Sequence, residues 1–212
     1  MIDPIIITDA STEPITLAEL KEHTRIDTTT TAQDTMLEDI YIPAARIEFE
    51  RLTGRTVHQK TIEWIFARFP PTPYPLVLQQ ATPLLSIASV KYKDSDGTET
   101  TWGSSNYIAD TDSVVGKVFP AYGVQWPSFT PYPVNPIRVR GNAGILTASP
   151  VTEASPMIKY VISAMVAGMW LWRESELLPE RRVGDMLEKN PHVASMLQTL
   201  TVRYGFGQSS AR

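Results

Sequence analysis

Ser155-Pro-Met-Ile-Lys-Tyr-Val-Ile-Ser-Ala-Met-Val-Ala-Gly-Met-Trp-Leu171 is the stretch of sequence that decides the fold. A serine followed by proline is typical of a helix N-cap with proline at the first helical position. Only Lys159 and Ser163 interrupt the apolar surface, and a helix that is apolar nearly all round is a buried one. Its longest apolar run, about 161–172, is shorter than the ~20 residues needed to cross a bilayer. We therefore predict a buried helix in a globular core and no membrane segment.

The sequence downstream predicts a last helix, because Asn190-Pro191 repeats the cap followed by proline. We expect this helix to end at Gly205 and residues 208–212 to form a flexible tail. Helical spacing places one apolar stripe along it, made of Val193, Met196, Leu197, Leu200 and Tyr204. This stripe either closes the protein's own bundle or contacts a partner.

Upstream, the first predicted helix begins at a capping box. Thr16 and Glu19 have the spacing at which each side chain satisfies the other residue's free backbone N–H. The helix is expected to end near Arg25, before a polar loop at 28–31.

A second helix is predicted over 34–53, with Asp34 as its N-cap and Gly54 just after its end. Pro43 lies in its interior, where it removes a hydrogen bond and should kink the axis. Its expected buried stripe, at helical spacing, consists of Leu37, Ile40, Tyr41, Ala44, Ile47 and Leu52.

Glu48 projects near the centre of that expected stripe. A buried carboxylate needs a partner, and the candidates are Arg138, Arg140 and Arg173. The alternative is that Glu48 lies where the stripe meets solvent.

The middle of the chain, 56–144, changes to a two-residue periodicity with turn signals between the runs, which predicts a small antiparallel sheet. The turn Asp94-Ser-Asp-Gly97 joins two of its strands as a hairpin. The loop 119–136 is rich in proline and aromatic residues, so we expect it to pack against the body or a neighbouring subunit. The predicted strands are 61–66, 86–93, 98–102, 114–118 and 137–140, with 5–8 as a possible additional strand.

Together these elements predict an α+β fold, in which a small helical bundle carries an antiparallel β-rich subdomain inserted between its long helices. The expected divisions are an N-terminal arm and helical part at 1–55, a β-rich insertion at 56–150 and C-terminal helices with a tail at 151–212.

Composition excludes several kinds of chemistry. The 212 residues include no cysteine, which excludes disulfides, thiolate metal sites and cysteine nucleophiles. The net charge of −4 argues against a dedicated nucleic-acid binder, since phosphate neutralisation needs a basic surface. The start lacks a secretory signal, so the cytoplasm of the producing cell is the default compartment.

No motif predicts catalysis, a metal or a cofactor. His23, His58 and His192 lack the spacing of zinc ligands. The acids Asp94 and Asp96 fit a hairpin turn better than a calcium loop. We therefore expect no enzyme, although a hydrolase that depends on Glu48 is kept as a remote alternative.

The basic residues occur in small groups, Arg46/Arg51/Arg55, Arg138/Arg140 and Arg181/Arg182. Given the acidic balance, we expect ion pairs within the fold or across a subunit contact, with phosphate contact as the second possibility. The residues expected at a subunit interface are Trp126, Phe129, Tyr132, Arg138 and Arg140.

Four segments in this order resemble the adaptor (head–tail connector) family of tailed bacteriophages and related gene-transfer particles. They are Ile15-Thr-Leu-Ala-Glu-Leu-Lys21, Glu50-Arg-Leu-Thr-Gly-Arg55, Pro83-Leu-Leu-Ser-Ile-Ala-Ser-Val-Lys-Tyr92 and Trp170-Leu-Trp-Arg-Glu174. The resemblance covers roughly 15–204.

The resemblance implies a structural protein of the virion neck that forms a ring of about a dozen copies with cyclic symmetry. It implies docking on the portal protein, binding of a stopper or tail-completion protein, and a channel through which genomic DNA passes without sequence-specific binding. The expected portal-binding residues are Leu197, Leu200, Arg203, Tyr204 and Phe206. Another neck or tail-completion protein is the alternative.

Overall fold

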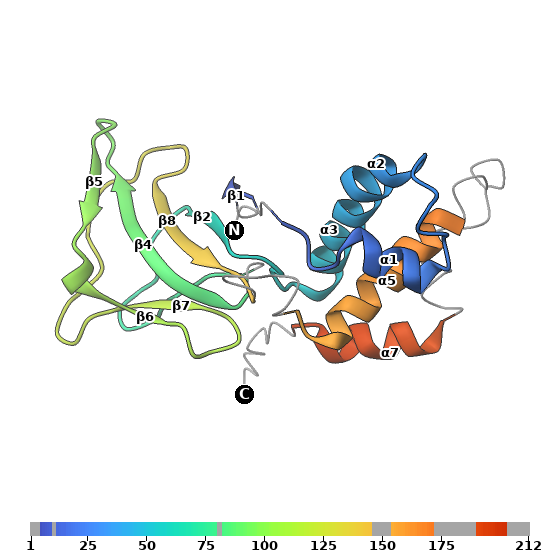
Figure 1. The fold of residues 1–212 in the computed structure, drawn as a ribbon. Helices are drawn as coiled ribbons and strands as arrows, with labels where there is room; N and C mark the ends of the chain where they lie inside the picture. Colours follow the sequence, from blue (N-terminus) through green and yellow to red (C-terminus); the bar gives the residue numbers. More distant parts are fainter. Residues whose placement is uncertain (1–4, 10–11, 80–81, 146–153, 172–189, 203–212) are drawn as a thin grey trace. The chain divides into compact units, whose positions relative to one another are not determined.

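The computed structural model describes residues 5–9, 12–79, 82–145, 154–171 and 190–202 of the chain. Their contacts divide into two compact units. The helical unit comprises the described residues of Ala10–Gln59 and Ile145–Thr201, and the β unit those of Met1–Asp9 and Lys60–Gly144 together with Val202. Both are drawn in Figure 1. Helices and antiparallel sheets confirm the predicted α+β class.

The first helix of the helical unit, α1 (Leu17–Thr24), has the predicted capping box. The Glu19 backbone N–H donates to Thr16 Oγ1 at 3.2 Å, and the Thr16 N–H donates to Glu19 Oε2 at 2.9 Å. Arg25 ends the helix in the left-handed conformation, with φ of 57°. The prediction for this segment is confirmed.

The second helix consists of three parts: α2 (Asp34–Met36), a π-helical turn η1 (Leu37–Tyr41) and α3 (Ile42–Thr53). Gly54 ends it with φ of 68°, as predicted. Asp34 is not the N-cap, because it is the first helical residue and its carboxylate pairs with Lys21 Nζ at 2.6 Å. The wide turn immediately before Pro43 accommodates this proline, since the Ile42 N–H donates to the Leu37 carbonyl.

The predicted buried stripe of this helix is wrong beyond the π turn. The turn inserts about one extra residue, so the face that packs inward shifts by one position along the chain. Ile40 and Ile47 are therefore exposed, while Tyr41, Ala44 and Leu52 are only half-buried. The buried positions are Leu37, Ile42, Ala45, Arg46, Phe49 and Thr53.

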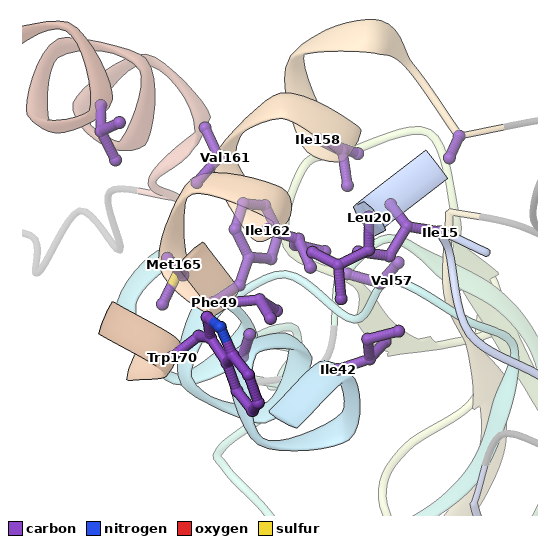
Figure 2. Packing of buried hydrophobic residues seen from close by; sticks show 14 of the residues in the cluster. Ile15, Leu20, Ile42, Phe49, Val57, Ile158, Val161, Ile162, Met165 and Trp170 are labelled. Atoms are coloured by element: carbon purple, nitrogen blue, oxygen red, sulfur yellow. The ribbon is translucent and has the colours of Figure 1, made fainter. Parts of the chain in front are cut away.

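Helices α5 (Pro156–Leu171) and α7 (Pro191–Leu200) complete the helical unit. Ser155 caps α5 as predicted, its Oγ accepting the Ile158 N–H at 3.4 Å. Figure 2 shows α5 placing Ile158, Ile162 and Met165 among side chains of the N-terminal helices. The buried core is aliphatic for the most part, and its larger members are Ile15, Leu20, Leu37, Ile42, Phe49, Val57, Ile158, Val161, Ile162, Met165, Val166, Trp170, Val193 and Leu197.

Two predictions for these helices need correction. Helix α5 is not buried all round: Met157, Tyr160 and Leu171 are exposed, whereas Ser163, expected on a polar strip, is buried. Helix α7 does not reach Gly205, because Thr201 caps it in an extended conformation. None of the described helices is long and apolar enough to span a membrane.

The β unit contains two antiparallel sheets. The first has the strand order β1 (Ile5–Thr8), β2 (Lys60–Phe66), β8 (Ile137–Ala143), β4 (Leu84–Lys93) and β5 (Glu99–Trp102). The second has the order β3 (Leu76–Val77), β7 (Lys117–Pro120) and β6 (Tyr107–Asp110), preceded by a short 3₁₀ turn, η2 (Ser104–Asn106). Six of these strands lie where strands were predicted, although the strand expected at 114–118 begins at Lys117. Strands β3 and β6 were not predicted, and the strands form two sheets instead of one.

Alternating side chains of the first sheet face the core of this unit, which is rich in aromatic residues. The turn between β4 and β5 is the predicted hairpin, since Asp94 Oδ1 accepts the N–H groups of Asp96 and Thr98 at 3.1 and 2.9 Å. The core consists of Ile62, Trp64, Phe66, Leu76, Leu78, Leu84, Val90, Trp102, Val118, Trp126, Ile137, Val139 and Ala143.

Candidate assembly surfaces

The open face of the five-stranded sheet has a buried carboxylate at its centre. Glu63 of β2 lies opposite Arg140 of β8 in the antiparallel register, and directly opposed residues share a face. The Arg140 guanidinium donates twice to Glu63 Oε2, at 2.9 and 3.2 Å, and Arg138 lies 3.5 Å from Oε1. Both arginines therefore form ion pairs within the fold, as one of the two predictions for them stated.

A second ion pair extends this face towards β5. Lys91 lies opposite Arg138, and its Nζ donates to Glu99 at 2.8 Å. That hydrogen bond lowers the pKa of the Glu99 carboxyl. Because the face combines three cations with two carboxylates, its charges are largely compensated within the β unit.

The aromatic residues expected at a subunit interface contact residues of their own β unit. Trp126 is only 7% exposed and stacks on Phe69, with ring centres 4.8 Å apart. Its indole N–H donates to the Tyr74 carbonyl at 3.0 Å. The ring centres of Phe129 and Tyr92 lie 4.8 Å apart, and Lys93 Nζ lies 4.0 Å from the ring centre of Tyr132.

A proline-lined cleft of about 840 Å³ lies beside this aromatic cluster. Its lining comes mainly from the segments 68–77 and 125–128 and includes Phe69, Trp126, Pro71, Pro75 and Pro127. Apolar surface dominates the lining, which suits an apolar segment more than a charged ligand.

The predicted portal-binding residues divide into two groups. Leu197 is buried in the helical core, and Leu200 is half-buried with its carbonyl accepting a hydrogen bond from Arg55 Nε at 2.5 Å. Arg203, Tyr204 and Phe206 lie outside the described residues. The described part of the stripe thus packs in the protein's own bundle.

The remaining charged residues of the helical unit form local ion pairs. Arg46 is buried and donates to Glu13 at 2.9 Å and to Glu50 at 3.3 Å. Glu48 pairs with Arg51, and this bond lowers the pKa of the Glu48 carboxyl. Glu48 thus lies at the margin with solvent, as the alternative prediction stated. Of the partners expected for it, Arg138 and Arg140 pair with Glu63, and Arg173 lies outside the described residues.

No group of three or more acidic or histidine side chains in the described part of the chain is arranged to hold a metal ion. His23 packs edge-on against Tyr160, His58 is buried, and His192 is exposed near the start of α7.

The surface feature that the sequence analysis missed is exposed apolar side chains. Strand β1, at one edge of the larger sheet, exposes Ile5, Ile6 and Ile7, and α2, η1 and α3 expose Met36, Ile40 and Ile47. The helical spacing of Ile40 and Ile47 is visible in the sequence, but it led to the prediction that both residues are buried. Large exposed apolar groups mark interaction surfaces.

Comparisons with known proteins identify a shared fold. No protein-family profile matches the chain, and no curated protein matches it. A chain in the neck of an empty GTA particle, computed with C6 symmetry, aligns with a TM-score of 0.72 at 18% identity over 97% of this chain and 99% of the other. A chain in the virion of a native gene transfer agent particle gives 0.72 at 17% identity, over 97% and 99%.

A third chain, from the neck of a native GTA particle computed with C12 symmetry, aligns with a TM-score of 0.65 at 14% identity, over 96% and 98%. These alignments run almost the full length of both chains, so they include the helical unit and the β unit. The chain therefore has the fold of these particle components.

Proposed function

We propose that this protein is a structural component of the neck of a tailed phage or gene transfer agent particle. The carrying observation is the match in fold to chains of GTA necks, which covers almost the full length of both chains. A shared fold alone does not imply a shared function. The order of motifs in the sequence, which resembles the adaptor family, supports the same role independently.

Within the neck, we propose the adaptor position, between the portal and the stopper or tail-completion protein. About a dozen copies would form a ring, and cyclic symmetry requires one face of each copy to meet a different face of the next. Two of the matching necks were computed with C6 and C12 symmetry, which is compatible with such a ring. The role is one of binding and requires no catalytic turnover.

The proposed portal contact is the end of the chain after α7, with Arg203, Tyr204 and Phe206. Leu197 is not proposed as a direct contact, since it is already buried in its own unit. Genomic DNA would pass through the ring without sequence-specific contacts, and a net charge of −4 is compatible with a lining that does not grip phosphates.

The test is the mass of the assembly, measured by native mass spectrometry for the protein alone and mixed with the portal encoded alongside it. A complex that carries about one ring of a dozen copies per portal ring supports the adaptor role. No association with an intact portal would contradict it.

Another neck or tail-completion protein is the alternative within the same class. Such a protein would bind the stopper or tail components but would not bind the portal under the same conditions. Measuring the mass of mixtures with each component separately distinguishes the two positions.

A further inference from the structure

We propose that the helical units of neighbouring copies pack against each other through two apolar stripes, one on α2–α3 and one on α5. This inference rests on the proposed ring and names the surfaces that would build it. The outer α3 stripe consists of Met36, Ile40, Ala44 and Ile47. The outer α5 stripe consists of Met157, Tyr160, Ala164, Ala167 and Leu171.

Both stripes have the spacing of a surface that receives another helix. Residues of the α5 stripe recur at alternating steps of three and four, and Ala44 and Ile47 of the α3 stripe are three apart. Met36 and Ile40 lie at the π turn, and their exposure assigns them to the α3 stripe. Steps of three and four place side chains along one seam of a helix, as in helix–helix packing. A partner helix is therefore a better match for these surfaces than an extended segment or a small molecule.

The stripes are apolar yet open to solvent. Ile40 is 58% exposed, Ile47 56% and Leu171 73%, and the other large members are also exposed. The alanines between them are half-buried and small, so a second helix can approach closely along both stripes. Apolar groups repeated along a helix face and left in water gain free energy when a partner covers them.

The two stripes belong to different faces of one unit. Helix α3 packs its buried residues, such as Phe49, against α5, whereas Ile40 and Ile47 of the outer α3 stripe are exposed. On α5, Met157, Tyr160 and Leu171 are exposed, whereas Ile162 is buried and Ala164 lies at the edge of the core. Two unlike surfaces on one unit are what a head-to-tail contact between identical copies requires.

Charge at the margins of the stripes favours this pairing. Glu38 and Asp39 are exposed beside the α3 stripe, whereas His23 packs against Tyr160 of the α5 stripe and exposed Arg25 ends the same helix as His23. Among the described residues, Glu38, Asp39 and Arg25 have no ion-pair partner within the chain. Contact of the α3 stripe with itself would bring the carboxylates of Glu38 and Asp39 of two copies together, which disfavours that pairing. Beside the α5 stripe the charges of exposed Glu22 and Arg25 offset each other, so no such repulsion opposes contact between the two unlike stripes.

Disulfide trapping tests the inference, because the chain contains no cysteine. Ile40→Cys combined with Ala164→Cys places one thiol near the middle of each stripe, so either relative direction of the two helices brings them together. Under oxidation we expect a ladder of linked chains on a denaturing gel. Each single variant should remain a monomer on that gel.

The matched control is Ile40→Cys combined with Tyr122→Cys, which places the second thiol on a fully exposed side chain of the β unit. It should give no ladder. As a second measurement, Ile40→Asp should lower the share of assembled protein in native mass spectra by roughly tenfold, because it puts an unpaired carboxylate in the contact. Val114→Asp, also at an exposed position, should leave that share unchanged.

The outcomes separate this inference from the proposed function. Linked dimers from Ile40→Cys alone would indicate contact of α3 with α3 and overturn the pairing. A ring in the native mass spectrum without a ladder from the double variant would overturn the pairing and leave the proposed neck role standing. Failure of the unmodified protein to assemble, alone or on its portal, would contradict the proposed function and the inference together.

Discussion

The helical unit and the β unit differ in the residues that form their cores and in the residues that cover one of their outer faces. The helical unit buries an aliphatic core and leaves further apolar residues, such as Ile40 and Ile47, on the outside of the same helix. The β unit buries an aromatic core and covers its open sheet face with ion pairs around Glu63. Both units also expose apolar side chains, such as Ile5 and Ile6 on β1, so the difference lies in how one face of each unit is treated. The charged groups on the open sheet face have partners within the β unit, whereas the exposed apolar side chains of α3 are left in water.

The largest expected effect distinguishes the two faces of α3. Phe49→Ala removes a fully buried side chain and should lower the free energy of unfolding by about 3–5 kcal/mol. Ile47→Ala, two residues earlier on the exposed face, should change it by less than ~1 kcal/mol. Urea denaturation followed by circular dichroism measures both. Equal losses for the two variants would contradict the assignment of buried and exposed faces.

The next effect concerns the aromatic core of the β unit. Trp126→Ala removes the ring that stacks on Phe69 and the hydrogen bond to the Tyr74 carbonyl, and should cost about 3 kcal/mol. Tyr122→Ala, in the same loop but fully exposed, should cost less than ~0.5 kcal/mol. Urea denaturation followed by circular dichroism measures both variants. If Trp126→Ala left stability unchanged but prevented ring assembly, Trp126 would be an interface residue, as the sequence analysis expected.

A smaller effect tests the ion pairs on the open sheet face. Glu63→Ala leaves Arg138 and Arg140 without their buried carboxylate and should lower the free energy of unfolding by about 1–3 kcal/mol. Glu99→Ala breaks the exposed pair with Lys91 and should cost at most ~1 kcal/mol. High salt should reduce the cost of the second variant more than that of the first, because exposed pairs are screened more strongly. A larger loss of stability for Glu99→Ala than for Glu63→Ala would show that burial does not determine how much these ion pairs stabilise the fold.

Local chemistry explains which parts of this fold could be predicted from the sequence. The capping box at Thr16, the cap at Ser155, the hairpin turn at Asp94 and the glycine at 54 depend on interactions within a few residues. Such signals can be read from the chain alone. For this reason the α+β class and most of the helices and strands were predicted correctly, whereas β3 and β6 were not predicted.

What could not be predicted depends on contacts distant in sequence or on a change of helical phase. The π turn before Pro43 shifts the buried face of α3 by one residue, so a regular helix assigned Ile40 and Ile47 to the core. The pairing of β8 between β2 and β4 joins strands far apart in the chain, and the partner of Arg138 follows from that pairing. The exposed stripe on α3 therefore could be assigned only once the π turn had fixed which residues of this helix face the core.

The smallest effect concerns the link between α1 and α5 through Glu19. Burial alone would raise the pKa of the Glu19 carboxyl, but the hydrogen bonds from Lys159 and from the Thr16 backbone outweigh it, and the pKa lies below its usual value of 4.5. The folded protein thus binds this proton less tightly than the unfolded chain does. The carboxylate therefore stabilises the fold above about pH 4.5, and this contribution is lost as the pH falls through the lower pKa of the folded state.

Glu19→Gln removes the ion pair with Lys159, whereas the amide oxygen can still accept the Thr16 N–H. Because the Glu19 side chain is 40% exposed, solvent screening should hold the loss at neutral pH below ~1 kcal/mol. Denaturation from pH 7 to pH 3 should show the difference from the unmodified protein shrinking towards zero. Glu22→Gln, exposed on the same helix and outside the capping box, is the matched control and should show no such trend. A loss that stayed constant across this range would mean that Glu19 acts through packing and not through its charge.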